Sequence, residues 1–93
     1  NKFVVNFRGK TDMTGAAASD RLEDAVNYQL IYNVIREEME IPSNLLEHVC
    51  GRILKRLEQE FPALVSGEIS IAKLNPPIGG QVGAFKCTMS YGE

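Results

Sequence analysis

The sequence of 93 residues lacks tryptophan and has one histidine and two cysteines. One histidine, His48, and two scattered cysteines, Cys50 and Cys87, make a poor zinc site, so we expect no structural metal. The cysteines form no CxxC motif, and no signal-peptide or lipidation pattern is present. We therefore interpret them as free thiols and expect a cytoplasmic protein.

An excess of charge of one sign is also missing. Ten basic and twelve acidic residues leave a net charge of −2 at pH 7. Nucleic-acid binding usually needs a clustered basic face, so we expect no nucleic-acid partner. No apolar run approaches the roughly 20 residues that cross a bilayer, so we expect no membrane partner. The composition is typical of one globular domain over residues 1–93, and its small size favours oligomerisation.

Two segments in the middle of the chain have the apolar period of amphipathic helices. Residues 27–39 form the first, with Asn27 as the expected N-cap and Pro42 beyond its end. The second is expected from Ser43 or Asn44 to about Glu60. We interpret the acidic cluster near the end of the first helix as a solvated face. Its members are Glu37, Glu38 and Glu40, and the apolar positions of this helix are Tyr28, Leu30, Ile31, Val34 and Ile35.

Three segments alternate in the way that half-buried strands do. Residues 2–8 place Phe3, Val5 and Phe7 on one face, and a polar connector spans residues 9–24. Residues 67–74 and 84–91 flank a Pro- and Gly-rich turn, which predicts a hairpin. The order is β-α-α-β-β. We predict the α+β class, with an antiparallel sheet and two helices packed on one face.

Three polar or aromatic residues stand out from this pattern. Lys73 shares the face of Ile69 and Ile71, where a lysine needs a partner or must extend to solvent. Glu47 falls in the first turn of the second helix, where it either complements the helix dipole or accepts hydrogen bonds from a ligand. Tyr28 is a core residue or a site residue. The turn from Asn75 to Gly80 is a fourth candidate, whose simpler interpretation is a rigid turn.

Three runs together resemble the dihydroneopterin aldolases of folate biosynthesis. They are LEDAVNY at 22–28, NLLEH at 44–48 and AKLNPPI at 72–78, in the order and at the spacing of that family. The resemblance implies a tunnelling fold (T-fold). It also implies a homo-oligomer, a tetrameric ring that commonly stacks into an octamer, with active sites between subunits. The implied reaction is a retro-aldol cleavage of dihydroneopterin without metal, cofactor or Schiff base.

The same resemblance implies roles for individual residues. Glu47 would anchor the pterin, and Leu46 and Leu45 would contact it beside that carboxylate. Tyr28 and Lys73 would handle protons. Val26 and Ala25 would line the pocket from the adjacent subunit.

The chain departs from the family pattern in three places. The family's first strand and its catalytic glutamate have no counterpart, and we expect them upstream of Asn1. Ala25 replaces a usual threonine. The hairpin reads Ile78-Gly79-Gly80-Gln81, where many relatives have a proline and a histidine.

Three alternatives stay open at this point. The first is a dihydroneopterin triphosphate epimerase, for which Arg8, Lys10 and Arg21 are candidate phosphate ligands. The second is a non-catalytic pterin- or purine-binding T-fold module. The third is a ferredoxin-like regulatory domain, which the two consecutive helices disfavour.

Overall fold

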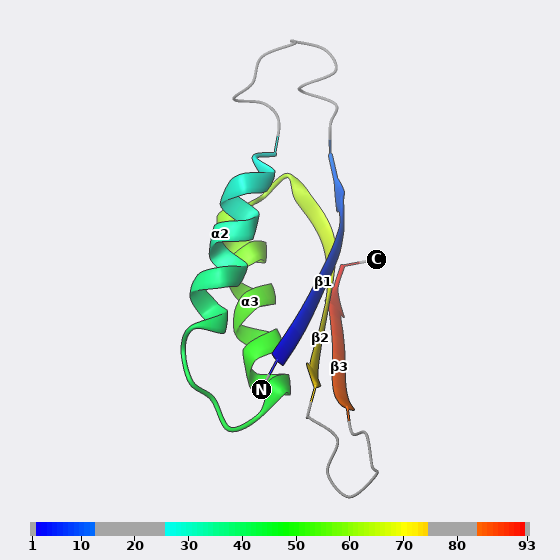
Figure 1. Cartoon of the computed structure of the whole chain (residues 1–93). Helices are drawn as coiled ribbons and strands as arrows, with labels where there is room; N and C mark the ends of the chain where they lie inside the picture. The colour runs from blue at the N-terminus through cyan, green and yellow to red at the C-terminus, as the bar shows by residue number, and fades with distance from the viewer. Residues whose placement is uncertain (1, 13–25, 75–83, 93) are drawn as a thin grey trace, which may run out of the picture.

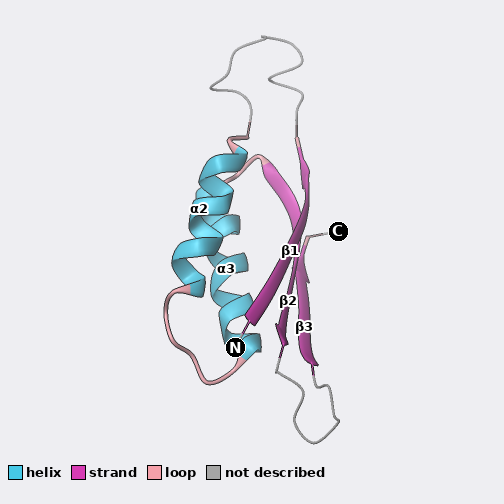
Figure 2. Ribbon diagram, viewed as in Figure 1, coloured by secondary structure: helices cyan, strands magenta, loops and turns pink. Residues whose placement is uncertain are grey.

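The computed structural model describes residues 2–12, 26–74 and 84–92. Its elements follow the order strand, helix, helix, strand, strand. The strands are β1 (Lys2–Thr11), β2 (Leu64–Leu74) and β3 (Ala84–Tyr91), and the helices are α2 (Tyr28–Met39) and α3 (Leu46–Glu60). Both helices cover the same face of the sheet (Figure 1, Figure 2). The α+β class is thus confirmed.

The sheet is antiparallel throughout, with β2 between β1 and β3. The predicted hairpin is confirmed, because Lys73 pairs with Phe85 and Leu74 pairs with Ala84. Its turn, including Asn75 to Gly80, lies outside the described residues. Both β1 and β2 are longer than predicted. At their shared end Gly9 pairs with Gly67, and a Cβ on Gly9 would lie 2.7 Å from Leu64 Cδ1.

The core lies between α3 and the sheet. Five side chains are fully buried there, and they come from one stripe of α3 and one face of β2: Cys50, Ile53, Leu57, Ile69 and Ile71. The apolar stripe predicted for α3 is therefore confirmed. Val5 and Phe7 pack against this core, whereas Phe3 on the same face of β1 is 45% exposed. The three residues share one face of β1, as predicted, but only Val5 and Phe7 join the core.

The two helices begin in different ways. The Asn27 side chain accepts hydrogen bonds from the backbone N–H groups of Gln29 and Leu30, which confirms the predicted N-cap of α2. Helix α3 begins at Leu46, so the predicted start at Ser43 or Asn44 is wrong. Its N-cap, Leu45, has an apolar side chain that accepts no capping hydrogen bond. The N–H groups of the first turn, which have no partner within the helix, therefore receive no hydrogen bond from the side chain of Leu45.

Only part of the predicted apolar face of α2 is buried. Ile31 and Val34 are buried, and Ile35 packs against the core. Tyr28 and Leu30 are exposed, because α2 packs mainly on α3 and covers less of the sheet. No helix in the described ranges is both long and apolar enough to cross a membrane.

The acidic end of α2 is tied to α3 by buried charge. Glu38 is buried, whereas Glu37 and Glu40 are exposed, so the predicted solvated face is wrong for Glu38. Its carboxylate accepts from Arg52 Nε at 2.8 Å and from Arg56 Nη1 at 3.1 Å. Burial alone raises the pKa of Glu38, but the hydrogen bonds from both arginines outweigh it and leave the pKa below its usual value.

We expect Glu38→Ala to lower the free energy of unfolding by about 3–5 kcal/mol, because it leaves a largely buried Arg52 guanidinium without its carboxylate. Urea unfolding of the full-length protein measures this. The matched control is Glu37→Ala, whose side chain is 59% exposed. It should cost at most about 1 kcal/mol. Equal losses in the two variants would contradict the buried network.

The ion pairs of Glu38 with Arg52 and Arg56 also predict that the free energy of unfolding depends on pH. A glutamate whose pKa is depressed by folding contributes its full stability above its unfolded pKa of about 4.3. That contribution is lost as the pH falls through the lower pKa of the folded state. The wild-type protein should therefore lose stability with acid more steeply than Glu38→Gln.

Candidate functional site

A pocket of about 360 Å³ lies where the first turn of α3 meets the adjoining ends of β2 and β3. In Figure 1 these three segments come together at the end of the molecule where β2 finishes and β3 begins. The pocket is lined by Asn44, Leu45, Leu46, Glu47, Lys73, Phe85, Lys86 and Cys87. Four of the residues predicted for the site, from segments distant in sequence, thus line one pocket.

Glu47 enters this pocket from the first turn of α3 and is exposed. A carboxylate in this position is favoured by the positive end of the helix dipole. Within the described parts of the chain, no hydrogen bond or ion pair engages its oxygens. Both oxygens are consequently free to accept hydrogen bonds from a ligand with adjacent N–H donors.

Lys73 enters the pocket from the end of β2. It shares a face with Ile69 and Ile71, as predicted, and is half-buried. Its position near the strand end lets the stem cover apolar surface while the ammonium reaches the pocket. The pocket therefore contains an unpaired carboxylate and an amine on two rigid elements.

Cys87 of β3 lines the pocket and is joined to Cys50 of α3. Cys50 Sγ donates a weak hydrogen bond to the Cys87 carbonyl at 3.9 Å, and both thiols are free, in agreement with the sequence interpretation. Burial, followed by the neighbouring Cys87, raises the pKa of Cys50 to about 12. Cys50 thus stays a neutral thiol at physiological pH and acts as packing.

Tyr28 lies at the other end of the fold. It lines an apolar pocket of about 290 Å³ with Phe7, Gly9, Thr11, Ile31, Tyr32, Ile35 and Leu64. Leu64 and Lys73 are nine residues apart on β2, or about 30 Å at about 3.3 Å per residue. One chain therefore does not bring Tyr28 to Glu47 and Lys73. Val26 packs against the core just before Tyr28, and Ala25 falls outside the described residues.

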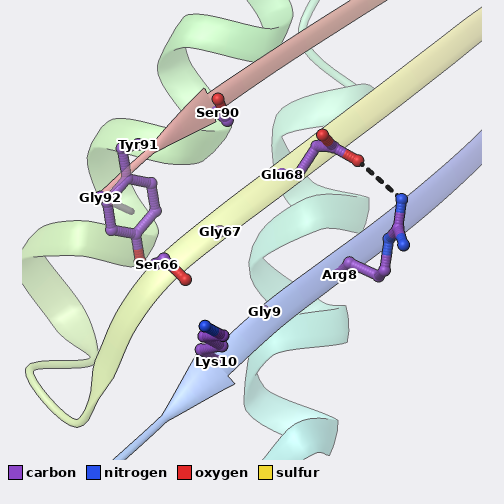
Figure 3. A pocket seen from close by; sticks show the side chains of 9 residues that line it. All are labelled: Arg8, Gly9, Lys10, Ser66, Gly67, Glu68, Ser90, Tyr91 and Gly92. Atoms are coloured by element: carbon purple, nitrogen blue, oxygen red, sulfur yellow. Dashed lines mark hydrogen bonds and ion pairs between the residues drawn. The ribbon is translucent and has the colours of Figure 1, made fainter.

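The uncovered face of the sheet holds a separate polar pocket of about 410 Å³ (Figure 3). Arg8 and Glu68 form an ion pair across it at 3.2 Å, and Lys10 lies beside them. Lys10 pairs with Ser66, seven residues before Lys73, which is about 23 Å along β2. Arg8 and Lys10 therefore lie away from the Glu47 pocket and on the other face.

Four residues that line the Glu47 pocket were not predicted as site residues: Asn44, Phe85, Lys86 and Cys87. The signal for Phe85 and Cys87 was their alternation on β3. Once the hairpin register places Phe85 opposite Lys73, the same face of β3 must border the pocket.

Comparison with known proteins identifies the family of the chain. A family model described as dihydroneopterin aldolase matches residues 1–90. The chain belongs to the dihydroneopterin aldolase family. A dihydroneopterin aldolase of Staphylococcus epidermidis is 37% identical over 79 residues, which are 84% of this chain and 65% of that protein. A dihydroneopterin aldolase of Streptococcus pyogenes serotype M1 is 34% identical over 79 residues, covering 84% of this chain and 66% of the relative.

The matched region is thus slightly under two thirds of these relatives' own length.

Proposed function

We propose that the full-length protein is a dihydroneopterin aldolase, with the Glu47 pocket as the pterin-binding part of its active site. The observation that carries this proposal is the meeting of Glu47 and Lys73 in one pocket, in a chain of this family. The reaction cleaves dihydroneopterin to hydroxymethyl-dihydropterin and glycolaldehyde. We further propose that the α+β unit is a T-fold.

The pocket supplies part of what this cleavage needs, and Tyr28 supplies a further group. Glu47 accepts two hydrogen bonds from the amino-pyrimidine edge of the pterin, and Leu45 and Leu46 contact the ring beside it. A proton then leaves the side-chain hydroxyl, the neighbouring C–C bond breaks, and its electrons pass to the ring imine. Lys73 and Tyr28 move the protons, including the one that converts the resulting enamine to product. The substrate's own ring accepts the electrons, so the proposed mechanism includes no cofactor.

The distance between Tyr28 and Lys73 has a direct consequence for this mechanism. Tyr28 lies beside Leu64 at the start of β2, and Lys73 lies about 30 Å away near its end. If both residues serve one pterin, they therefore come from two copies of the chain. We therefore propose a ring-shaped homo-oligomer, a tetramer or a stacked octamer. Val26 and Ala25 would enter the shared pocket together with Tyr28.

The triphosphate epimerase alternative finds no support in the described residues. Its candidate phosphate ligands Arg8 and Lys10 lie on the opposite face of the sheet from Glu47. Arg21 lies outside the described residues.

Incubation of the full-length protein with dihydroneopterin, followed by chromatography, tests the proposed aldolase function. Hydroxymethyl-dihydropterin and glycolaldehyde are expected; binding without turnover would indicate a non-catalytic pterin-binding module.

We expect Glu47→Ala to abolish measurable pterin binding, because it removes two charge-assisted hydrogen bonds worth roughly 1.5–3 kcal/mol each. Fluorescence titration with neopterin measures the affinity. Glu58→Ala, an exposed carboxylate near the other end of α3, is the matched control and should bind normally. If Glu47 only complements the helix dipole, affinity would stay unchanged while stability falls by about 0.3–1 kcal/mol.

Lys73→Ala should lower turnover by on the order of a hundredfold or more, because a positioned proton donor or acceptor is lost. The affinity for neopterin should change much less, since Glu47 holds the ring. Lys10→Ala, on the other face of the sheet, should turn over normally. Borohydride should trap no substrate on Lys73; a trapped adduct would replace this mechanism with a Schiff-base mechanism.

Mixed oligomers test whether the site is shared. Tyr28→Phe and Lys73→Ala should each be nearly inactive alone. When the two are unfolded, mixed in equal amounts and refolded together, about one quarter of the sites should regain both native residues, as expected for a head-to-tail interface. A mixture no more active than its components, or sedimentation as a monomer at micromolar concentration, would disprove the shared site.

A further inference from the structure

Phe85 has no role in the core that would explain an aromatic residue at its position. Its side chain is 66% exposed, so it buries little apolar area and contributes little to folding. Nevertheless it lines the same pocket as Glu47 and Lys73. An exposed aromatic ring in a polar pocket is suited to contact with a ligand.

The register of the sheet fixes where Phe85 stands. It lies directly opposite Lys73 on β2, and Phe3 lies opposite Lys73 on the other side. Directly opposed residues have their Cβ atoms about 4.5–5.5 Å apart on the same face of a sheet. The ring of Phe85 therefore stands next to the lysine and on the side of the sheet that α3 covers. Phe3 has the same relation to Lys73 but does not line the pocket.

We propose that Phe85 stacks on the flat ring system of the ligand and makes the site selective for a fused bicyclic heterocycle over a single ring. This inference rests on the proposed function. Glu47 recognises only the amino-pyrimidine edge, which a monocyclic 2-aminopyrimidinone also presents. Stacking depends instead on the area of overlap, which the second ring of a pterin increases. Glu47 thus recognises the edge of the ligand, and Phe85 recognises the size of its ring system.

The test compares two ligands on matched variants of the full-length protein. Neopterin is the bicyclic probe, followed by its fluorescence, and isocytosine is a monocyclic competitor with the same edge. Phe85→Ala should weaken neopterin binding by roughly tenfold to a hundredfold, in line with the loss of one stacking contact. Isocytosine binding should weaken by only a few-fold. Phe85→Tyr should restore the preference, and the control Phe3→Ala should keep both affinities.

Four outcomes would overturn the inference. Phe85→Ala with an unchanged preference for neopterin over isocytosine would remove Phe85 from ligand selection and leave the proposed function intact. An equal loss of both ligands together with a smaller sedimentation coefficient would make Phe85 a contact between copies of the chain. Loss of the same preference in Phe3→Ala would show that the effect comes from any truncation at this end of the sheet. A wild-type protein that neither binds neopterin nor cleaves dihydroneopterin would refute the proposed function, and this inference with it.

Discussion

The packing of one face of β2 under α3 is the constraint on which the candidate site depends. Ile69 and Ile71 are fully buried beneath Ile53 and Leu57 of the helix. A strand alternates its side chains, so burying these two residues also directs Lys73 to the helix side. The helix in turn begins beside the end of β2, and its first turn brings Glu47 to that lysine. Apolar packing in the middle of the fold therefore determines which polar groups meet at its end.

The same packing leaves the fold with two unlike ends. One end presents a carboxylate and an amine, and the other presents Tyr28 beside an apolar hollow. Neither end alone contains all the groups that the proposed reaction uses. Under the proposed mechanism, a complete site would require the unlike ends of two copies to meet, and catalysis would then depend on assembly.

Local patterns were enough to predict much of this arrangement. The buried stripe of α3 follows from the helical period of 3.6 residues, and the side of β2 that carries Lys73 follows from the strand period of two. The burial of Glu38 could not be predicted in this way, because it depends on two arginines from another helix. Nor could the pocket role of Phe85, which depends on the pairing of β3 with β2. Periodicity describes one element, whereas these features arise where two elements meet.

The buried charges between the helices have a consequence for how accurately the site is placed. Apolar stripes tolerate sliding, because one leucine or isoleucine can replace another in a groove. The contacts of Glu38 with Arg52 and Arg56 do not tolerate sliding. A shift of one helical turn, about 5.4 Å, would leave a buried carboxylate without its partners. Arg52 also donates to the Ile41 carbonyl, in the link that leads into α3. The ionic cluster thus fixes the register of α2 on α3. With it is fixed the position of Tyr28, at the start of α2, relative to Glu47 at the start of α3.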